Sequence, residues 1–304
     1  MKTRKILVTG ASGLVGTRIT DLLLKRGYEV HALGRKKQND TAGVKHFVWN
    51  IPRQEMDPAA LKEVVGIIHL AGAGVADERW SAERKKEILE SRTQSTQLLY
   101  QSLQKHKTNV RVIVSASAVG YYGDCGAGWV SEEQAPADTF LAQVCRDWEA
   151  GVVKMQKLGL REVRCRIGIV LSQRGGALPE LTRTIPLGLA PYFAKPNLYY
   201  PWIHIDDVCG ILLHALEHDS VKGAVNTTAP APVKIRTLME EILEAKKSSA
   251  VLVPVPSLAL KIAMGEMSDM LLSSQRCSAS KITEAGYQFL YPDLKKALAA
   301  IYTR

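Results

Sequence analysis

The chain has 304 residues, of which 46% are hydrophobic, enough for one large α/β domain with a smaller lobe. Its five cysteines are scattered, without a Cys-x-x-Cys pair or metal-type spacing, so we expect a reducing compartment, no disulfide framework and no metal site. The formal net charge is +10, but the cations are spread along the chain. That distribution favours a solvated surface, with a smaller share attracting a polyanionic ligand, over a nucleic-acid interface.

The chain enters an apolar run almost at its first residue, and no apolar run is long enough to span a bilayer. We therefore expect no signal peptide, no membrane partner and a cytoplasmic protein. Short apolar runs predict strands, and helical periodicity predicts helices. The predicted strands are 5–9, 29–33, 66–71, 110–115 and 162–171, and the predicted helices are 17–26, 81–106, 142–158, 208–217 and 237–246.

This alternation predicts the α/β class, with a doubly wound parallel sheet of the NAD(P)-binding Rossmann type. Prolines become frequent after residue 230. We therefore expect a Rossmann domain over residues 1–230, with substrate-lobe insertions near 174–202. A small, mainly helical C-terminal substrate lobe is expected over residues 231–304.

A glycine-rich motif follows the first predicted strand and opens the first predicted helix, as Thr-Gly-Ala-Ser-Gly-Leu-Val-Gly over residues 9–16. Gly10 allows a tight turn, Gly13 lets a pyrophosphate approach the backbone, and Gly16 lets the helix pack close to the sheet. The start of the helix then offers free N–H groups to phosphates. The motif predicts a dinucleotide site that includes Gly10, Ser12, Gly13, Leu14, Val15 and Gly16.

The end of the second predicted strand distinguishes NADP(H) from NAD(H). NAD binders usually place Asp or Glu there to accept hydrogen bonds from the ribose. This chain has Gly34 and Arg35 followed by two lysines, with no acid. Because cations attract a 2′-phosphate, the sequence predicts NADP(H) in preference to NAD(H), with Arg35 as the main ligand.

Further motifs lie beyond the glycines. They are His-Leu-Ala-Gly at 69–72, Glu-Ile-Leu-Glu-Ser-Arg at 87–92, Ser-Ala-Ser-Ala at 115–118, Val-Cys-Arg-Asp-Trp-Glu at 144–149, Arg-Ile-Gly-Ile-Val-Leu at 166–171, Gly-Gly-Ala-Leu at 175–178 and Trp-Ile-His-Ile-Asp-Asp-Val at 202–208. With the tail at 286–294, they make the chain resemble atypical, extended short-chain dehydrogenases/reductases. The resemblance is to the sugar-nucleotide-epimerase-like group of the NAD-dependent epimerase/dehydratase family, which carries a C-terminal domain of unknown function.

The resemblance implies roles for several residues. Backbone along Leu70, Ala71 and Gly72 would line the cofactor. Glu87 and Arg92 match cofactor-contacting positions, although a pair of surface charges explains them equally well. Ser115 and Ser117 would end the strand nearest the nicotinamide. Arg166 would lie near the cofactor.

The usual Tyr-x-x-x-Lys acid–base pair is missing. Aligned through Glu149, the chain has Leu141 at the tyrosine position and Cys145 at the lysine position. Another group would then move the proton, and Tyr121 and Tyr122 follow Ser117 closely enough to be candidates. A structural aromatic pair in a loop is the alternative for these two tyrosines.

The catalytic candidates are therefore Ser117, Tyr121 and Tyr122. The first hypothesis is an NADP(H)-dependent oxidoreductase or epimerase-like enzyme acting on a small or nucleotide-linked substrate. The second is a non-catalytic NADP(H)-binding redox sensor or regulatory protein. Nucleic-acid binding ranks below both, and a homodimer remains open. We expect Asp206 and Asp207 to cap the helix that follows them.

Overall fold

The computed structural model describes residues 4–303. It contains two compact units, each assembled from separate stretches of chain. The first unit takes the chain up to Ser117 together with Val144–Cys165 and Cys209–Val225. The second takes Ala118–Gln143, Arg166–Val208 and the chain from Asn226 onward. The division at residue 230 expected from the sequence stays a prediction.

An eight-stranded, mostly parallel sheet forms the centre of the first unit. The last one or two residues of three of its strands belong to the second unit. In spatial order its strands are β13 (Gly223–Thr227), β8 (Arg161–Ile167), β6 (Val112–Ala118), β5 (Val64–His69), β1 (Lys5–Thr9), β2 (Glu29–Gly34), β3 (Val44–Asn50) and β4 (Glu55–Met56). The chain winds outward from β1 through β2 to β3, then returns to β5 on the other side of β1. This reversal confirms the predicted doubly wound sheet, and it creates the switch point where such sheets bind ligands.

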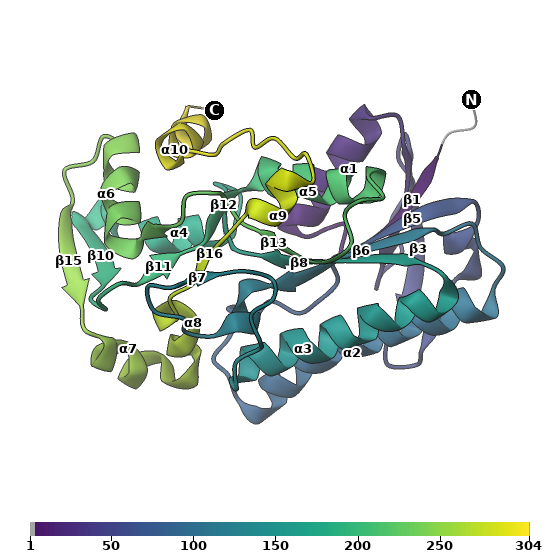
Figure 1. Ribbon diagram of the computed structural model, residues 1–304, viewed down its shortest axis with the longest axis horizontal. Helices are drawn as coiled ribbons and strands as arrows, with labels where there is room; N and C mark the ends of the chain where they lie inside the picture. Colours follow the sequence, from purple (N-terminus) through teal and green to yellow (C-terminus); the bar gives the residue numbers. More distant parts are fainter. Residues whose placement is uncertain (1–3, 304) are drawn as a thin grey trace. The chain divides into compact units, whose positions relative to one another are not determined.

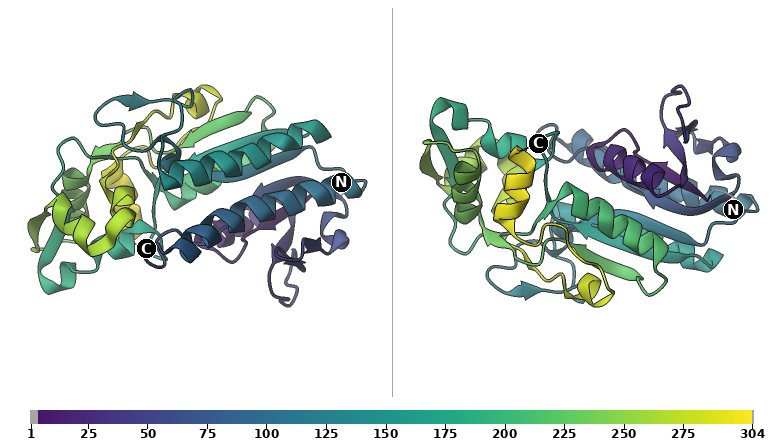
Figure 2. Two further views of the ribbon diagram at one scale, coloured as in Figure 1. Left: turned by 90° about the horizontal axis from the view of Figure 1, so that it is seen from below. Right: turned by 90° about the horizontal axis from the view of Figure 1, so that it is seen from above.

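Helices cover both faces of this sheet. Helices α1 (Leu14–Lys25) and α5 (Ile205–Glu217) lie on one face, while α2 (Ala82–Lys105) and α3 (Phe140–Val153) run side by side on the other (Figures 1 and 2). The inward side of α1 is apolar through Ile19 and Leu23, both fully buried. Such burial of an amphipathic face contributes most of a helix's stability in a folded protein.

Strands β3, β4 and β13 of the sheet were not predicted, and one predicted strand is divided in two. The strand expected over 162–171 is divided at Gly168 into β8 and β9 (Ile169–Leu171). The backbone of Pro201 comes so close to Gly168 that a Cβ there would lie 2.0 Å from the Pro201 carbonyl oxygen. Strand β3 also follows β2 in parallel without the usual crossover helix. The described stretch between them, residues 35–43, contains no helix.

The second unit combines short strand pairs with helices. Its pairs are β7 (Trp129–Val130) with β16 (Arg276–Cys277), β9 with β12 (Trp202–His204), β10 (Leu189–Phe193) with β15 (Val251–Val255), and β11 (Tyr199–Tyr200) with β14 (Val233–Lys234). Its helices are α4 (Ala177–Thr182), α6 (Ile235–Ala245), α7 (Ser257–Met264), α8 (Ser268–Leu272), α9 (Ser280–Glu284) and α10 (Leu294–Tyr302). An apolar core that includes Trp202, Leu238 and Leu298 holds this unit together.

The two aspartates expected to cap α5 fall inside its first turn, because the helix begins at Ile205. The buried carboxylate of Asp207 instead accepts hydrogen bonds from the Tyr287 hydroxyl at 2.8 Å and from the backbone amides of Leu290 and Tyr291. Asp207 therefore anchors the segment that precedes α10. No helix within residues 4–303 has the length and apolar character needed to cross a membrane.

Candidate functional site

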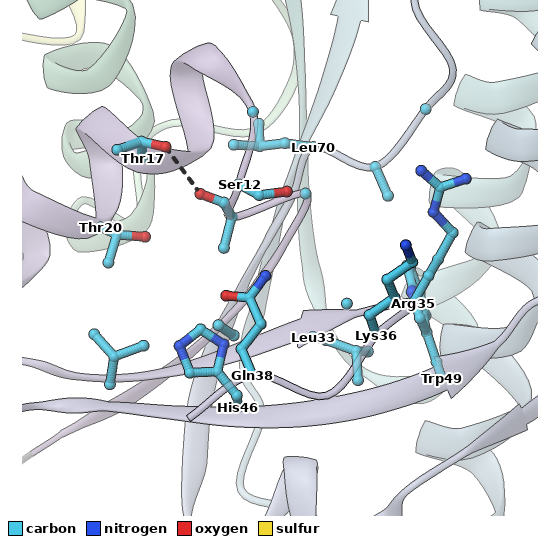
Figure 3. Close-up of a pocket in the computed structure, with 18 of the residues that line it drawn as sticks. Ser12, Thr17, Thr20, Leu33, Arg35, Lys36, Gln38, His46, Trp49 and Leu70 are labelled. Atoms are coloured by element: carbon cyan, nitrogen blue, oxygen red, sulfur yellow. Dashed lines mark hydrogen bonds between the residues drawn. The ribbon is translucent and has the colours of Figure 1, made fainter. Parts of the chain in front are cut away.

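A cavity of about 560 Å³ opens in the first unit at the C-terminal ends of β1, β2 and β5 (Figure 3). Its walls contain Gly10, Ser12, Gly13, Gly34, Arg35, Leu70, Ala71, Gly72 and Glu87 from the predicted set. They also contain residues that were not predicted from the sequence, among them Thr17, Thr20, Gln38 and His46. Leu14, Val15, Gly16, Arg92 and Ser115 are not among the lining residues, and Arg166 belongs to the second unit.

The glycine loop brings bare backbone to the cavity wall. Gly10 has φ +69°, and a Cβ there would lie 2.9 Å from the Leu70 carbonyl oxygen, so the loop and the end of β5 are in close contact. A Cβ at Gly16 would lie 2.0 Å from the carbonyl oxygen of Gly10. The glycines at these two positions are therefore required by packing. Gly13 is the N-cap residue of α1 and makes no side-chain cap.

A buried hydrogen-bond network fixes the opposite wall. The Thr9 hydroxyl lies 2.8 Å from Nδ1 of His69 and accepts from the amides of Leu70 and Ala71. Nε2 of His69 lies 3.1 Å from the Thr96 hydroxyl, which itself donates to the Arg92 carbonyl. His69 must therefore donate through Nε2 and accept at Nδ1. Burial, helped by the nearby Arg92 cation, lowers the pKa of His69 to about 3, so this ring is neutral.

Two arginines of α2 hold the loop that follows β5. Arg92 donates to the carbonyl oxygens of Ala73 and Ile88, and its guanidinium carbon lies 3.0 Å from where a Gly72 side chain would begin. Arg84 donates to the Gly74 carbonyl at 2.6 Å and forms an ion pair with Glu87 at 2.6 Å. In this structure Arg92 shapes the backbone around the cavity. A direct contact of Arg92 or Glu87 with a cofactor stays a prediction.

The end of β2 supplies the cations. Arg35 and Lys36 are exposed, and within residues 4–303 neither side chain makes a hydrogen bond or ion pair. Gln38 and His46 extend the same wall toward Thr17 and Thr20 (Figure 3). The sequence held a signal for this part, because the Val, Phe and Trp residues of 44–50 are typical of a strand. Recognising that strand would have placed His46 beside β2.

The cavity fits a phosphorylated dinucleotide on three observations. The glycines leave no side chain between loop and ligand, and the N-terminus of α1 is free of side-chain caps and acids. The Thr20 hydroxyl is buried without a hydrogen-bond partner among the described residues. Cations without partners occupy the position where NAD binders carry an acid. These are the groups that a pyrophosphate and an additional phosphate require.

Ser117 lies at the end of β6, on the same edge of the sheet as the cavity, since parallel strands share their C-terminal edge. It is buried, and its hydroxyl donates to Oε1 of Glu149 at 2.7 Å. The other oxygen of Glu149 accepts from Arg164 at 3.2 Å, and Arg164 also binds Glu162 through two nitrogens. Glu149 served in the sequence only to align the helix, and its contact with Ser117 was not predicted. The hydroxyl of Ser115 donates to the Ala116 carbonyl.

The two candidate tyrosines have different environments in the second unit. The Tyr122 hydroxyl is buried, donates to Asn226 at 2.6 Å and accepts from Arg166 at 3.0 Å. Burial raises the pKa of Tyr122, and Arg166 opposes that rise only in part. Tyr121 is partly exposed and presents its ring to the same guanidinium, 3.5 Å from its centroid. Arg166 is therefore enclosed by both rings and by the Glu132 carbonyl.

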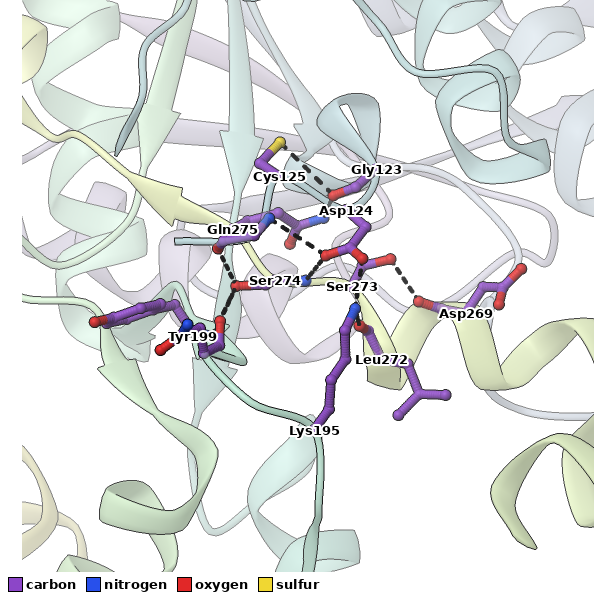
Figure 4. Close-up of polar contacts among 12 residues, drawn as sticks. Gly123, Asp124, Cys125, Lys195, Tyr199, Asp269, Leu272, Ser273, Ser274 and Gln275 are labelled. Atoms are coloured by element: carbon purple, nitrogen blue, oxygen red, sulfur yellow. Dashed lines mark hydrogen bonds and ion pairs between the residues drawn. The ribbon is translucent and has the colours of Figure 1, made fainter. Parts of the chain in front are cut away.

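A polar cluster ties together three loops of the second unit, at 123–126, 195–199 and 272–275 (Figure 4). Asp124 pairs with Lys195 and accepts from the backbone amide of Ser274 at 3.0 Å. Burial alone would raise the pKa of Asp124, but the Lys195 ammonium and the backbone amides lower it. Gln275 donates to the Gly123 carbonyl at 2.9 Å. The predicted substrate segment near 174–202 is thus anchored at its C-terminal part.

Comparison with known proteins identifies two parts of the chain. Residues 6–227 match the NAD dependent epimerase/dehydratase family, and residues 255–301 match a domain of unknown function, DUF1731. An epimerase family protein of Mycobacterium bovis is 33% identical over 305 residues, which cover 100% of this chain and 99% of the relative. A chloroplastic SDR39U1 homologue of Arabidopsis thaliana is 32% identical over 97% of this chain and 86% of its own length.

A solved structure is similar over nearly the whole chain. It is human epimerase family protein SDR39U1, crystallised with NADPH, with a TM-score of 0.86 and 29% identity over 98% of this chain and 99% of that chain. The matches confirm the resemblance found in the sequence. Together with the glycine loop and the doubly wound sheet, they show that the chain belongs to the NAD-dependent epimerase/dehydratase family.

Proposed function

We propose that the chain is an NADP(H)-dependent oxidoreductase or epimerase-like enzyme that acts on a small or nucleotide-linked substrate. The observation that carries this proposal is the cavity of about 560 Å³ between the glycine loop and the cations at the end of β2. The family and the NADPH bound to the human relative support the proposal.

Different residues of the cavity would bind different parts of the cofactor. The amides at the start of α1 and the loop around Gly13 would hold the pyrophosphate. Arg35, with Lys36 beside it, would bind the 2′-phosphate, which favours NADP(H) because NAD(H) offers these cations no partner. The backbone at Leu70 and Ala71 would line the side nearer β5. A bound nicotinamide supplies hydride transfer, and the protein supplies position and proton movement.

Proton movement would fall to groups outside a Tyr-x-x-x-Lys pair. Ser117 would contact a substrate oxygen, and its oriented hydroxyl suits that role because Glu149 fixes its direction. Of the two tyrosines, Tyr121 suits proton transfer better, since no described residue makes a hydrogen bond with its hydroxyl. The hydroxyl of Tyr122 is already committed to Asn226 and Arg166.

One observation favours the alternative of a non-catalytic NADP(H)-binding sensor or regulatory protein. The hydroxyl protons of both Ser117 and Tyr122 are used in internal hydrogen bonds, to Glu149 and Asn226. A protein that had kept the fold for binding alone would tolerate this arrangement. Turnover therefore decides between the two functions.

The test loads ligand-free protein with NADPH or NADP⁺ and screens cofactor absorbance and product formation against ketones, aldehydes and UDP-sugars. If the protein is an enzyme, we expect turnover to fall by at least about a hundredfold in Ser117→Ala and in Tyr121→Phe, with NADPH affinity unchanged. The matched variant Tyr122→Phe should keep more activity than Tyr121→Phe. Tight NADPH binding without turnover on the whole panel would support the sensor instead.

A further inference from the structure

We propose that the imidazole of His46 is a further part of the 2′-phosphate site, on the wall that also carries the cations at the end of β2. The choice of NADP(H) over NAD(H) then depends on His46 as well as on Arg35. This inference rests on the proposed function, because it names a further specificity-determining residue of the same cavity.

The missing crossover helix is what exposes His46 to the cavity. His46 pairs with Ala32 in the register of β3 and β2, and both residues line the cavity. A helix between these strands would normally cover this face of the sheet. Here residues 35–43 form only a loop, and the carboxylate of Asp40 in that loop accepts from the His46 backbone amide at 2.8 Å. This contact holds the loop, and with it the cationic end of β2, against the strand that carries His46.

Several polar side chains at and around His46 have no hydrogen-bond partner in the part of the chain that the structure describes and are left for a ligand to bind. His46 is partly buried, and its ring makes no hydrogen bond with any described residue. On the same wall, the Thr20 hydroxyl is fully enclosed and lacks a partner among residues 4–303. Gln38 reaches into the cavity beside His46 (Figure 3). Buried polar groups are nearly always hydrogen-bonded, so this cluster points to a polar ligand.

A phosphate suits this cluster better than a neutral group does. Arg35 and Lys36 lie in the same cavity and carry no described acidic partner. An imidazole donates a hydrogen bond to a phosphate oxygen and, once protonated, adds a charge.

Charged groups on the neighbouring elements set the background for this interaction. They are Asp21 on α1, Arg35, Lys36, Lys37 and Asp40 on the loop, Lys45 on β3, Glu29 on β2 and Glu87 on α2. Glu87 is paired with Arg84, and Glu29 is paired with Lys45. Lys45 is not a lining residue of the cavity, although it adjoins His46 on the same strand. Lys45→Gln is therefore a matched control that removes a nearby charge outside the cavity.

The experiment measures the NADP⁺ and NAD⁺ affinities of the wild type and of the variants by calorimetry. We expect His46→Gln to weaken NADP⁺ binding about tenfold and to leave NAD⁺ binding unchanged. Lys45→Gln should leave both affinities within about twofold. Thermal unfolding checks that the variants fold, and His46→Asn serves as a second variant.

Equal effects of His46→Gln on the two dinucleotides, or no effect on either, would overturn the role of His46 while leaving the proposed function standing. Failure of the ligand-free wild type to bind NADP⁺ would overturn the proposed function itself. The wild-type titration therefore distinguishes the two failures.

Discussion

The hydroxyl of Ser117 donates a 2.7 Å hydrogen bond to Glu149, and both side chains are buried in the first unit. Because Arg164 holds the second oxygen of Glu149, the carboxylate cannot rotate freely. The hydroxyl proton of Ser117 therefore points at Glu149. The lone pairs of the Ser117 oxygen are left to accept a hydrogen bond from another group. A substrate hydroxyl, more than a carbonyl, suits a serine held in this way.

Two substitutions of Glu149 should distinguish the contribution of its charge to stability from the contribution of its hydrogen bond with Ser117. Glu149→Ala leaves Ser117 and one nitrogen of Arg164 without partners, and we expect the free energy of unfolding to fall by about 3 kcal/mol. Glu149→Gln keeps an acceptor for Ser117 and should cost about 1 kcal/mol. Urea unfolding measures both. Glu90→Ala, which removes an exposed pair with Lys86, is the control, and a cost for Glu149→Ala no larger than this control's would contradict the network.

The neutral His69 should make stability depend on pH. Its pKa in the folded protein is about 3, below the ordinary value of 6.5, so the unfolded chain binds a proton that the folded chain excludes. Stability is then highest above pH 6.5 and falls as the pH drops toward 3. Between pH 7 and pH 4.5 this group alone would remove about 3 kcal/mol.

His69→Gln tests this dependence, because glutamine can still donate to Thr96 and accept from Thr9. The variant should lose less stability than the wild type on going from pH 7 to pH 4.5 in urea unfolding. Identical losses in the two proteins would show that His69 is not the group responsible.

The glycine loop offers a graded pair of substitutions. A Cβ at Gly16 would lie 2.0 Å from the Gly10 carbonyl oxygen, whereas at Gly13 the distance would be 3.3 Å. We expect Gly16→Ala to destabilise the fold by about 2–3 kcal/mol and Gly13→Ala by less than about 1 kcal/mol. Both should weaken NADPH binding, as followed by its fluorescence. A Gly13→Ala variant with unchanged NADPH affinity would place the pyrophosphate elsewhere.

Residues close in the sequence carried most of what could be predicted. The spacing of Gly10, Gly13 and Gly16 within a strand–turn–helix predicted the fold and the position of the cavity, because each glycine meets a local requirement of the backbone. The absence of an acid beside Arg35 is likewise visible in one short stretch. These features need no knowledge of distant contacts.

Other parts of the site depend on contacts between distant residues. Ser117 and Glu149 are 32 residues apart, and Tyr122 and Asn226 are 104 residues apart, so no local pattern reveals either pair. His46 was missed for a different reason. The expectation of a helix after each strand hid a strand that follows β2 directly, although the residue types of 44–50 favour one.

The central claim is that a cation at position 35 selects the dinucleotide that carries a 2′-phosphate. Calorimetric titration of folded, ligand-free protein with NADPH and with NADH tests it most directly. The account predicts that the wild type binds NADPH at least about tenfold more tightly than NADH, that Arg35→Gln lowers this preference without weakening NADH binding, and that the exposed neighbour variant Lys37→Gln retains it. Equal affinity for the two dinucleotides, or no heat with either, would contradict it.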